Sequence, residues 1–429
     1  MRLNLENPFL VIRSATFKQT SLTLTATLIN GILGMVFYIF LARELGPSDF
    51  GLFSLSIVVL ALTADIGNFG ANTGIVNFVS KFIKSDTPLA LKYLKIGFLY
   101  KLFMGLAVIL FGCLLSPFLA EEVFKKPEMF PLLRLAFLGV GSTWLFSFTT
   151  SYYQATQKFR SWGMIQIFTN LIRLLGVVCA FYYFHLDIYV ALTFYIIAPF
   201  IGFIVSFVNI SFEFIREKFN KANVNTFFSF NKWVGISAIA GATSSRADTF
   251  ILGRLATSAG IGVYSAAGQI VQVVPQLIGA IGTVVAPKFS SFDNDNKMFG
   301  YFKKLQLMVM VIAGVMVLSI PIVKIVTKVF FGPEYDRSFG IFVILFVSML
   351  VFLISIPVHN VIIYYYQYPK LFSYLSVINL LVVILLAYFL TLKFGISGTA
   401  YASLVGNTVN FLVPMVWFKK KIKLKATSS

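Results

Sequence analysis

Charged side chains occur inside several long apolar runs of this 429-residue sequence. Three bases are candidates because of their depth within a run: Lys101, Arg173 and Arg246. A charge at bilayer depth is costly unless it is paired or hydrated, so a base inside a membrane span is a functional candidate by default. A guanidinium can also fork onto phosphate oxygens. The three bases are therefore our candidates for binding an anionic ligand.

Each base also has a structural interpretation. Arg173 could be a cation paired within a helix bundle for packing, and Lys101 could extend its stem toward the nearest interface. Arg246 lies two residues before Asp248, so the two side chains do not face each other on one helix. We expect them to find different partners, with Asp248 paired locally.

Acidic residues are the second candidate chemistry. Asp65 is the only acid deep in the N-terminal half, and it could exchange a proton or hold Na⁺, or form a salt bridge to a neighbouring helix. Asp248 is the other candidate for H⁺ or Na⁺ coupling. The two Cys and two His cannot build a disulfide framework or a zinc cluster, so we expect no metal. For His359, we expect a hydrogen bond to a backbone carbonyl.

The composition predicts the kind of element that positions these residues. Hydrophobic residues make up 58% of the chain, charged residues make up 12%, and the mean hydropathy is +0.86. One water-soluble core could not bury so much apolar surface, and this predicts an all-α integral membrane protein. The net charge of +19 lies mostly at the ends of apolar runs, which favours a topology signal over a nucleic-acid partner.

The apolar runs are long enough to cross a bilayer, which takes about 20 residues in a helix. About twelve transmembrane helices are predicted, at approximately 16–42, 50–80, 93–117, 130–155, 160–184, 187–212, 227–253, 259–286, 302–331, 337–364, 370–393 and 396–418. Pro199, Pro275, Pro321 and Pro357 lie inside runs and predict kinks. The distribution of Lys and Arg places both termini in the cytoplasm of a multi-pass protein of the cell (inner) membrane.

A repeat relates the two halves of the chain. Residues 43–54 (RELGPSDFGLFS) align with residues 254–265, which matches Arg43 with Arg254 and Gly51 with Gly262. The repeat predicts two six-helix lobes, 1–215 and 216–429, related by a pseudo-two-fold axis along the membrane normal. An arrangement of this kind is typical of a transporter.

Three motifs resemble the polysaccharide (lipid-linked oligosaccharide) flippase family of the multidrug/oligosaccharidyl-lipid/polysaccharide exporter superfamily. They are the stretch from Ala42 to Ser54, the stretch from Gly70 to Val76 and the stretch from Arg246 to Gly253. The resemblance covers the whole chain. It implies a non-enzymatic carrier that moves a polyprenyl-pyrophosphate-linked oligosaccharide from the cytoplasmic to the outer leaflet by alternating access, for surface polysaccharide biosynthesis.

The resemblance also implies partners and a site. Arg173, Arg246 and Lys101 are expected to line the pyrophosphate and glycan cavity, with no cofactor beyond H⁺ or Na⁺ coupling. A polysaccharide polymerase or glycosyltransferases are the expected protein partners. The nearest alternative is a cation-coupled drug or metabolite antiporter of the same superfamily. A membrane-embedded polymerase or glycosyltransferase is a third hypothesis, which the short loops disfavour.

Overall fold

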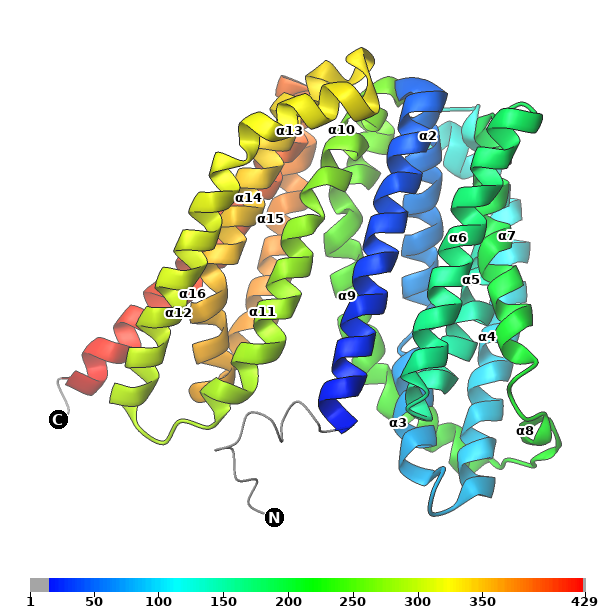
Figure 1. The fold of residues 1–429 in the computed structure, drawn as a ribbon, viewed down its shortest axis with the longest axis horizontal. Coiled ribbons are helices and arrows are strands. Elements are labelled where there is room, and N and C mark those ends of the chain that lie inside the picture. The colour runs from blue at the N-terminus through cyan, green and yellow to red at the C-terminus, as the bar shows by residue number, and fades with distance from the viewer. Residues whose placement is uncertain (1–14, 427–429) are drawn as a thin grey trace. The chain divides into compact units, whose positions relative to one another are not determined.

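The computed structural model describes residues 15–426, and in this part of the chain every regular element is helical (Figure 1). The first elements are α2 (Ala15–Asn68), α3 (Ala71–Phe82), α4 (Thr87–Phe118), η1 (Leu119–Val123), α5 (Met129–Ala155), α6 (Phe159–Tyr183), α7 (Ile188–Phe207), α8 (Glu213–Arg216) and α9 (Lys221–Leu255). They are followed by α10 (Ser258–Val271), α11 (Val273–Ser290), α12 (Asp295–Leu318), α13 (Ile320–Val326), η2 (Thr327–Phe331), η3 (Pro333–Tyr335), α14 (Asp336–Asn360), η4 (Val361–Tyr365), α15 (Lys370–Phe394) and α16 (Ile396–Ala426).

These helices confirm the prediction of an all-α integral membrane protein. Nine helices of the described chain are long and apolar enough to cross a membrane. One of them, α2, contains a kink between its two arms. The total of twelve spans and the pseudo-two-fold axis remain predictions.

Glycine and proline set the main breaks in the helices. Gly46 has φ 72° and is followed by Pro47, and the kink there divides α2 into two arms. Glycine adopts this left-handed conformation without a steric penalty, and proline suits the first turn of the next helix. The run predicted at 50–80 is interrupted, because Phe69 and Gly70 have φ values of 42° and 77°.

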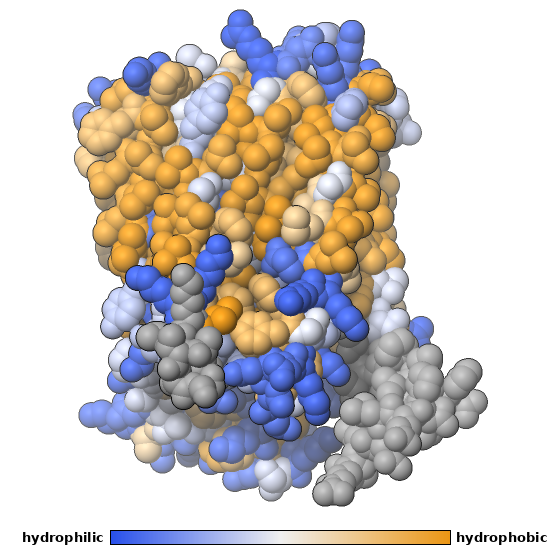
Figure 2. All heavy atoms as spheres, turned by 90° about the vertical axis from the view of Figure 1, so that its left-hand side faces the viewer, coloured by the Kyte–Doolittle hydropathy of each residue, from blue (hydrophilic) through white to orange (hydrophobic). Residues whose placement is uncertain are grey.

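The outer faces of the helices expose large apolar side chains. On α4, Phe103, Leu110 and Leu114 are 59–66% exposed. Figure 2 shows hydrophobic residues over a broad band on one face, with hydrophilic residues gathered at its two ends. A soluble monomer rarely exposes so large an apolar surface, whereas lipid solvates it.

The described chain forms two compact units. Unit 1 comprises the described residues up to Leu41 together with Ser56–Ala242, and unit 2 comprises Ala42–Leu55 together with the described residues from Thr243 onward. The end of the predicted lobe at residue 215 thus falls within unit 1. The assignment of 1–215 and 216–429 to two membrane lobes stays a prediction.

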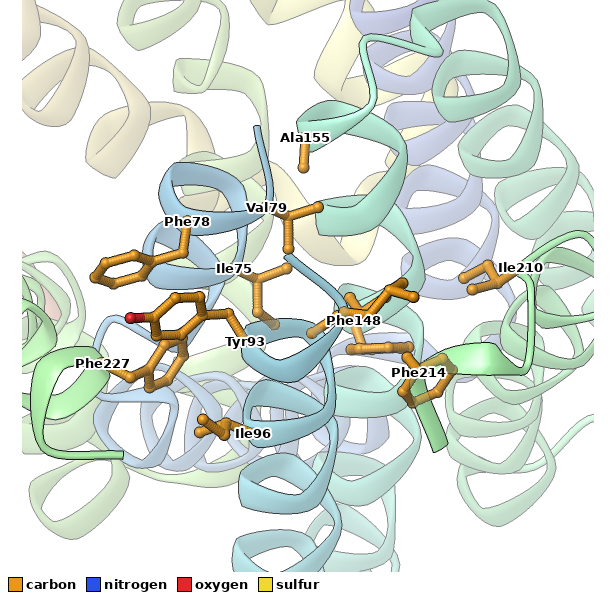
Figure 3. Close-up of a cluster of buried hydrophobic side chains, with 12 residues drawn as sticks. Ile75, Phe78, Val79, Tyr93, Ile96, Phe148, Ala155, Ile210, Phe214 and Phe227 are labelled. Carbon is orange, nitrogen blue, oxygen red and sulfur yellow. The ribbon is translucent and has the colours of Figure 1, made fainter. Parts of the chain in front are cut away.

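An aromatic cluster holds one end of unit 1 together (Figure 3). Phe78 of α3 stacks on Tyr93 of α4, with ring centroids 4.4 Å apart, and Phe227 of α9 packs on both rings. Phe148 and Phe214 extend the cluster to α5 and α8. Close packing of this kind fixes the ends of α3, α4, α5, α8 and α9 relative to one another.

Unit 2 includes the tip of the hairpin between the two arms of α2, residues 42–55, which we call the hairpin tip. A Cβ on Gly51 would lie 1.9 Å from the Ser258 carbonyl oxygen, and a Cβ on Gly262 would lie 2.0 Å from that of Pro47. The Tyr335 hydroxyl donates a hydrogen bond of 2.8 Å to the carbonyl of Ala42. The glycines matched by the sequence repeat are therefore packed backbone against backbone.

Candidate functional site

A polar cavity of about 290 Å³ lies inside unit 1 and brings two of the predicted residues together. Asp65 comes from the second arm of α2, and Arg173 comes from α6. Residues of α5 and α7, among them Thr143 and Tyr195, complete the wall. From the sequence we predicted different roles for these two residues, ion coupling for Asp65 and substrate binding for Arg173. The structure places both in the wall of one cavity.

The guanidinium of Arg173 is held mainly by aromatic rings. Its central carbon lies 3.9 Å from the ring centroid of Tyr195 and 5.8 Å from that of Phe37. Nη1 donates a hydrogen bond of 3.3 Å to Oδ1 of Asn170, and Asn170 donates one of 2.8 Å to Asn30. Cation–π contacts stabilise a desolvated cation without neutralising it. None of these three partners is anionic, and the carboxylate of Asp65 lines the same cavity.

Two buried donors in this wall have no hydrogen-bond partner among residues 15–426. They are Nε of Arg173 and Nε2 of Gln166. A buried donor without a partner costs about 1–3 kcal/mol, so such atoms in a hollow usually meet water or a ligand. A ligand rich in acceptor oxygens, such as a phosphate or a sugar, would satisfy both.

The size of the cavity limits what it can hold in this conformation. At about 30 Å³ for each water, 290 Å³ corresponds to roughly ten waters. This is enough for a phosphate group or one sugar ring with some water. A whole oligosaccharide does not fit in it, so a longer glycan would have to extend beyond this cavity.

Lys101 lies elsewhere in unit 1. Its side chain is only 1% exposed, and its ammonium donates to Oδ1 of Asn72, Oγ of Ser147 and, at 3.5 Å, the carbonyl of Trp144. These three acceptors match the three donors of an ammonium. Lys101 also lines a separate, mainly apolar cavity of about 300 Å³ beside Gly105. The contacts join α3, α4 and α5, and binding of a substrate by Lys101 remains a prediction.

Arg246 and Asp248 lie on the part of α9 that belongs to unit 2. The carboxylate of Asp248 accepts hydrogen bonds from the Tyr264 hydroxyl at 2.7 Å, from the Thr249 backbone N–H at 2.6 Å and from the Thr249 hydroxyl at 3.2 Å. Asp248 thus contacts its sequence neighbour Thr249 and also Tyr264 of α10. The roles of Arg246 in substrate binding and of Asp248 in ion coupling remain predictions.

His359 has the contact that the sequence favours. Its Nε2 lies 2.9 Å from the carbonyl oxygen of Asn410, and its ring packs against Phe352 and Phe372. These contacts support a structural role within α14.

The side-chain amides of the polar cavity were not predicted from the sequence. Gln166, Asn170 and Arg173 follow one another at positions i, i+4 and i+7 of α6, so they share one face of the helix. This spacing within an apolar run was the available signal. Tyr195 and Asn30 come from other helices, and only the fold brings them to Arg173.

The sequence matches a family model described as "Polysaccharide biosynthesis protein" over residues 16–293. Lipopolysaccharide biosynthesis protein WzxC of Escherichia coli is 24% identical over 366 residues, which are 81% of this chain and 69% of that protein. A putative O-antigen transporter of Shigella flexneri is 21% identical over 378 residues, 84% of this chain and 87% of that one.

Solved structures share the fold. An inward-facing multidrug resistance MATE family transporter of the MOP superfamily has a TM-score of 0.77 at 12% identity, covering 93% of this chain and 96% of that one. The lipid II flippase MurJ in its inward closed conformation has a TM-score of 0.72 at 17% identity, covering 93% and 87%. The family match spans more than half of the sequence, and the chain belongs to the polysaccharide biosynthesis protein family.

Proposed function

We propose that this chain is a flippase that moves a polyprenyl-pyrophosphate-linked oligosaccharide from the cytoplasmic to the outer leaflet for the assembly of a surface polysaccharide. One observation carries the proposal: a polar cavity inside unit 1 holds an arginine with an unpartnered donor, Nε. The family and the relatives named for lipopolysaccharide and O-antigen support the glycan substrate.

The charge in the cavity suits the pyrophosphate of such a lipid. A pyrophosphate carries about two negative charges into a medium where a charge is costly, so a retained cation lowers the barrier to its passage. The planar guanidinium of Arg173 can donate two parallel hydrogen bonds to one phosphate in a fixed fork geometry, whereas a lysine ammonium acts as a compact point charge. Lys101 and Arg246 are the secondary candidates.

Coupling to H⁺ or Na⁺ is part of the proposal. Asp65 is the first candidate because it lines the same cavity as Arg173. Asp248 is the second, although its carboxylate already accepts three hydrogen bonds. Transport by the Asp65→Asn variant should no longer respond to an imposed ion gradient. An unchanged response would remove Asp65 from the coupling.

The site of action follows from the same proposal. The protein works in the cytoplasmic membrane with both termini inside, beside the polymerase and glycosyltransferases that use its substrate, and it catalyses no covalent step. Residues 1–14 and 427–429 of those termini lie outside the described residues. An accessibility assay on a tag fused to either end would test the orientation.

The test of function in cells is the Arg173→Ala variant. At equal expression, surface polysaccharide should fall by about tenfold or more, because a hydrogen bond to a charged group contributes about 1.5–3 kcal/mol. Arg337→Ala is the matched control, since Arg337 is an exposed arginine outside the cavity. Equal export by both variants would exclude Arg173 from the mechanism. Loss of cation efflux with unchanged polysaccharide would favour the antiporter alternative.

A further inference from the structure

A second hollow of unit 1, about 560 Å³ in volume, lies on the outer side of α6 and α7. The two helices pack along each other and lie side by side in Figure 1. Three apolar residues of its wall, Met164, Phe168 and Val205, are 39–52% exposed. In a membrane protein, such side chains face hydrocarbon, so the hollow is a groove that opens toward lipid. We call it the α6–α7 groove.

The two ends of the groove differ in chemistry. Lys158, Ser161 and Asn209 lie where α6 begins and just after α7 ends, whereas Met164, Phe168 and Val205 lie further along these two helices. Because α5 ends at Ala155 and α6 begins at Phe159, the polar end lies where two membrane-spanning helices end. Helix ends of this kind meet the membrane–water interface, and the apolar end continues into the hydrocarbon.

The polar end carries positive charge without an acidic partner. The Lys158 ammonium lies 5.9 Å from the ring centroid of Tyr152, and within the described chain it makes no ion pair. Arg160, exposed two residues later, also has no ion pair to any described residue. A neighbouring hollow of about 370 Å³ is lined by Lys158, Arg160 and Ser161. Lys158 and Ser161 line both hollows, and among residues 15–426 neither Lys158 nor Arg160 has an acidic partner.

We propose that the α6–α7 groove binds an anionic phospholipid of the surrounding membrane. The headgroup phosphate lies at Lys158, Arg160 and Ser161, and one acyl chain lies along Met164, Phe168 and Val205. The volume of the groove is within the usual range of small-molecule sites, about 300–1,000 Å³. Basic side chains at an interface attract anionic lipid, and the apolar end matches a hydrocarbon chain. This site is distinct from the transport cavity and does not depend on the transported substrate.

The role of the positive charge of Lys158 and Arg160 is tested by measuring lipid binding to the purified full chain. Native mass spectrometry compares phosphatidylglycerol with phosphatidylcholine of the same acyl chains. The wild type should prefer phosphatidylglycerol. K158A/R160A should weaken that binding by roughly 30-fold, because each basic side chain at a lipid surface contributes about a fivefold factor. K218A/K221A removes the same charge from exposed residues that do not line either hollow, and it should bind as the wild type does.

The role of the apolar end of the α6–α7 groove is tested independently by filling it with a larger side chain. Val205→Trp places a large ring in the apolar end and should lower phosphatidylglycerol binding. Ile204→Trp is the matched control, because Ile204 is 48% exposed on the same helix and does not line the groove. Three results would each overturn the proposal. They are equal binding of the two phospholipids by the wild type, equal loss of phosphatidylglycerol binding in K158A/R160A and K218A/K221A, and tighter binding of polyprenyl phosphate than of phosphatidylglycerol.

Discussion

Arg173 is the residue on which the proposed transport site depends. Its guanidinium lies over the ring of Tyr195 and donates to Asn170, while its Nε has no partner in the described part of the chain. A flat, delocalised cation can stack on a ring and still present donors at its edge, which the compact ammonium of lysine cannot do. The geometry therefore favours arginine specifically, and Arg173→Lys should not restore transport fully.

The ring of Tyr195 should matter more than its hydroxyl. Tyr195→Leu removes the cation–π contact, which contributes about 2 kcal/mol when desolvated, and transport should fall by roughly 30-fold. Tyr195→Phe keeps the ring and should retain most of the activity. Transport rates of the two variants in vesicles measure the difference, and equal rates would show that the ring does not position Arg173.

Lys101 should prove important for stability. Lys101→Met leaves the acceptors Asn72 and Ser147 without their donor, at a cost of about 1–3 kcal/mol for each buried group left unpaired. The melting temperature in detergent should drop clearly. Lys84→Met, which changes an exposed lysine, serves as the control and should melt as the wild type does.

Residue types in the sequence showed which charges lie inside long apolar runs, but not how these charges group in the structure. That Asp65 and Arg173 share a cavity depends on how α2 packs against α6, which no local pattern records. The three acceptors of Lys101 likewise come from two other helices. Contacts between neighbours in the sequence were easier to predict, as with Asp248 and its neighbour Thr249.

At the scale of elements, the apolar runs predicted where helices lie better than where they break. The kink at Gly46–Pro47 falls in the predicted gap between two runs. The break at Phe69–Gly70 was not predicted, since the run at 50–80 stays apolar across it and a glycine inside a run does not reveal its φ. Pro321 lies in the first turn of α13, whereas Pro357 lies inside α14, although both predicted kinks.

The glycine contact in the hairpin tip provides a sharp test of packing. Gly51→Ala and Gly262→Ala each place a methyl group about 2 Å from a backbone carbonyl oxygen, and overpacking of this kind costs about 1–3 kcal/mol or more. Both variants should lose thermal stability or folded yield. Gly34→Ala, where a Cβ meets open space, should be neutral or slightly stabilising. Similar behaviour of all three variants would contradict the close contact.

At the scale of the molecule, the hairpin tip belongs to unit 2 although it lies early in the sequence. The repeat predicted that residues 43–54 and 254–265 are equivalent, but it could not show that they pack on each other. Composition was sufficient to predict a membrane protein, because that prediction depends only on the total apolar surface. Membership of a compact unit depends on contacts between distant residues, such as Tyr335 and Ala42.

If the hairpin tip stays with unit 2 during transport, a cross-link within unit 2 should be harmless. Nη1 of Arg43 donates to the carbonyl of Val329 at 3.2 Å, and both side chains are exposed. In a background without Cys113 and Cys179, R43C/V329C joined by a reducible bis-thiol reagent should transport at the uncross-linked rate. Inhibition reversed by reduction would show that the tip moves relative to unit 2.

The central claim is that this chain flips a lipid-linked oligosaccharide through a site that contains Arg173. The most direct measurement reconstitutes the purified chain in liposomes with a fluorescent polyprenyl-pyrophosphate oligosaccharide and follows the label's exposure to an impermeant quencher. The wild-type chain should flip the lipid well above the rate in protein-free liposomes, Arg173→Ala should reduce this rate about tenfold or more, and Arg337→Ala should leave it unchanged. Wild-type flipping no faster than that of empty liposomes, with efflux of a cationic dye from the same vesicles, would contradict it.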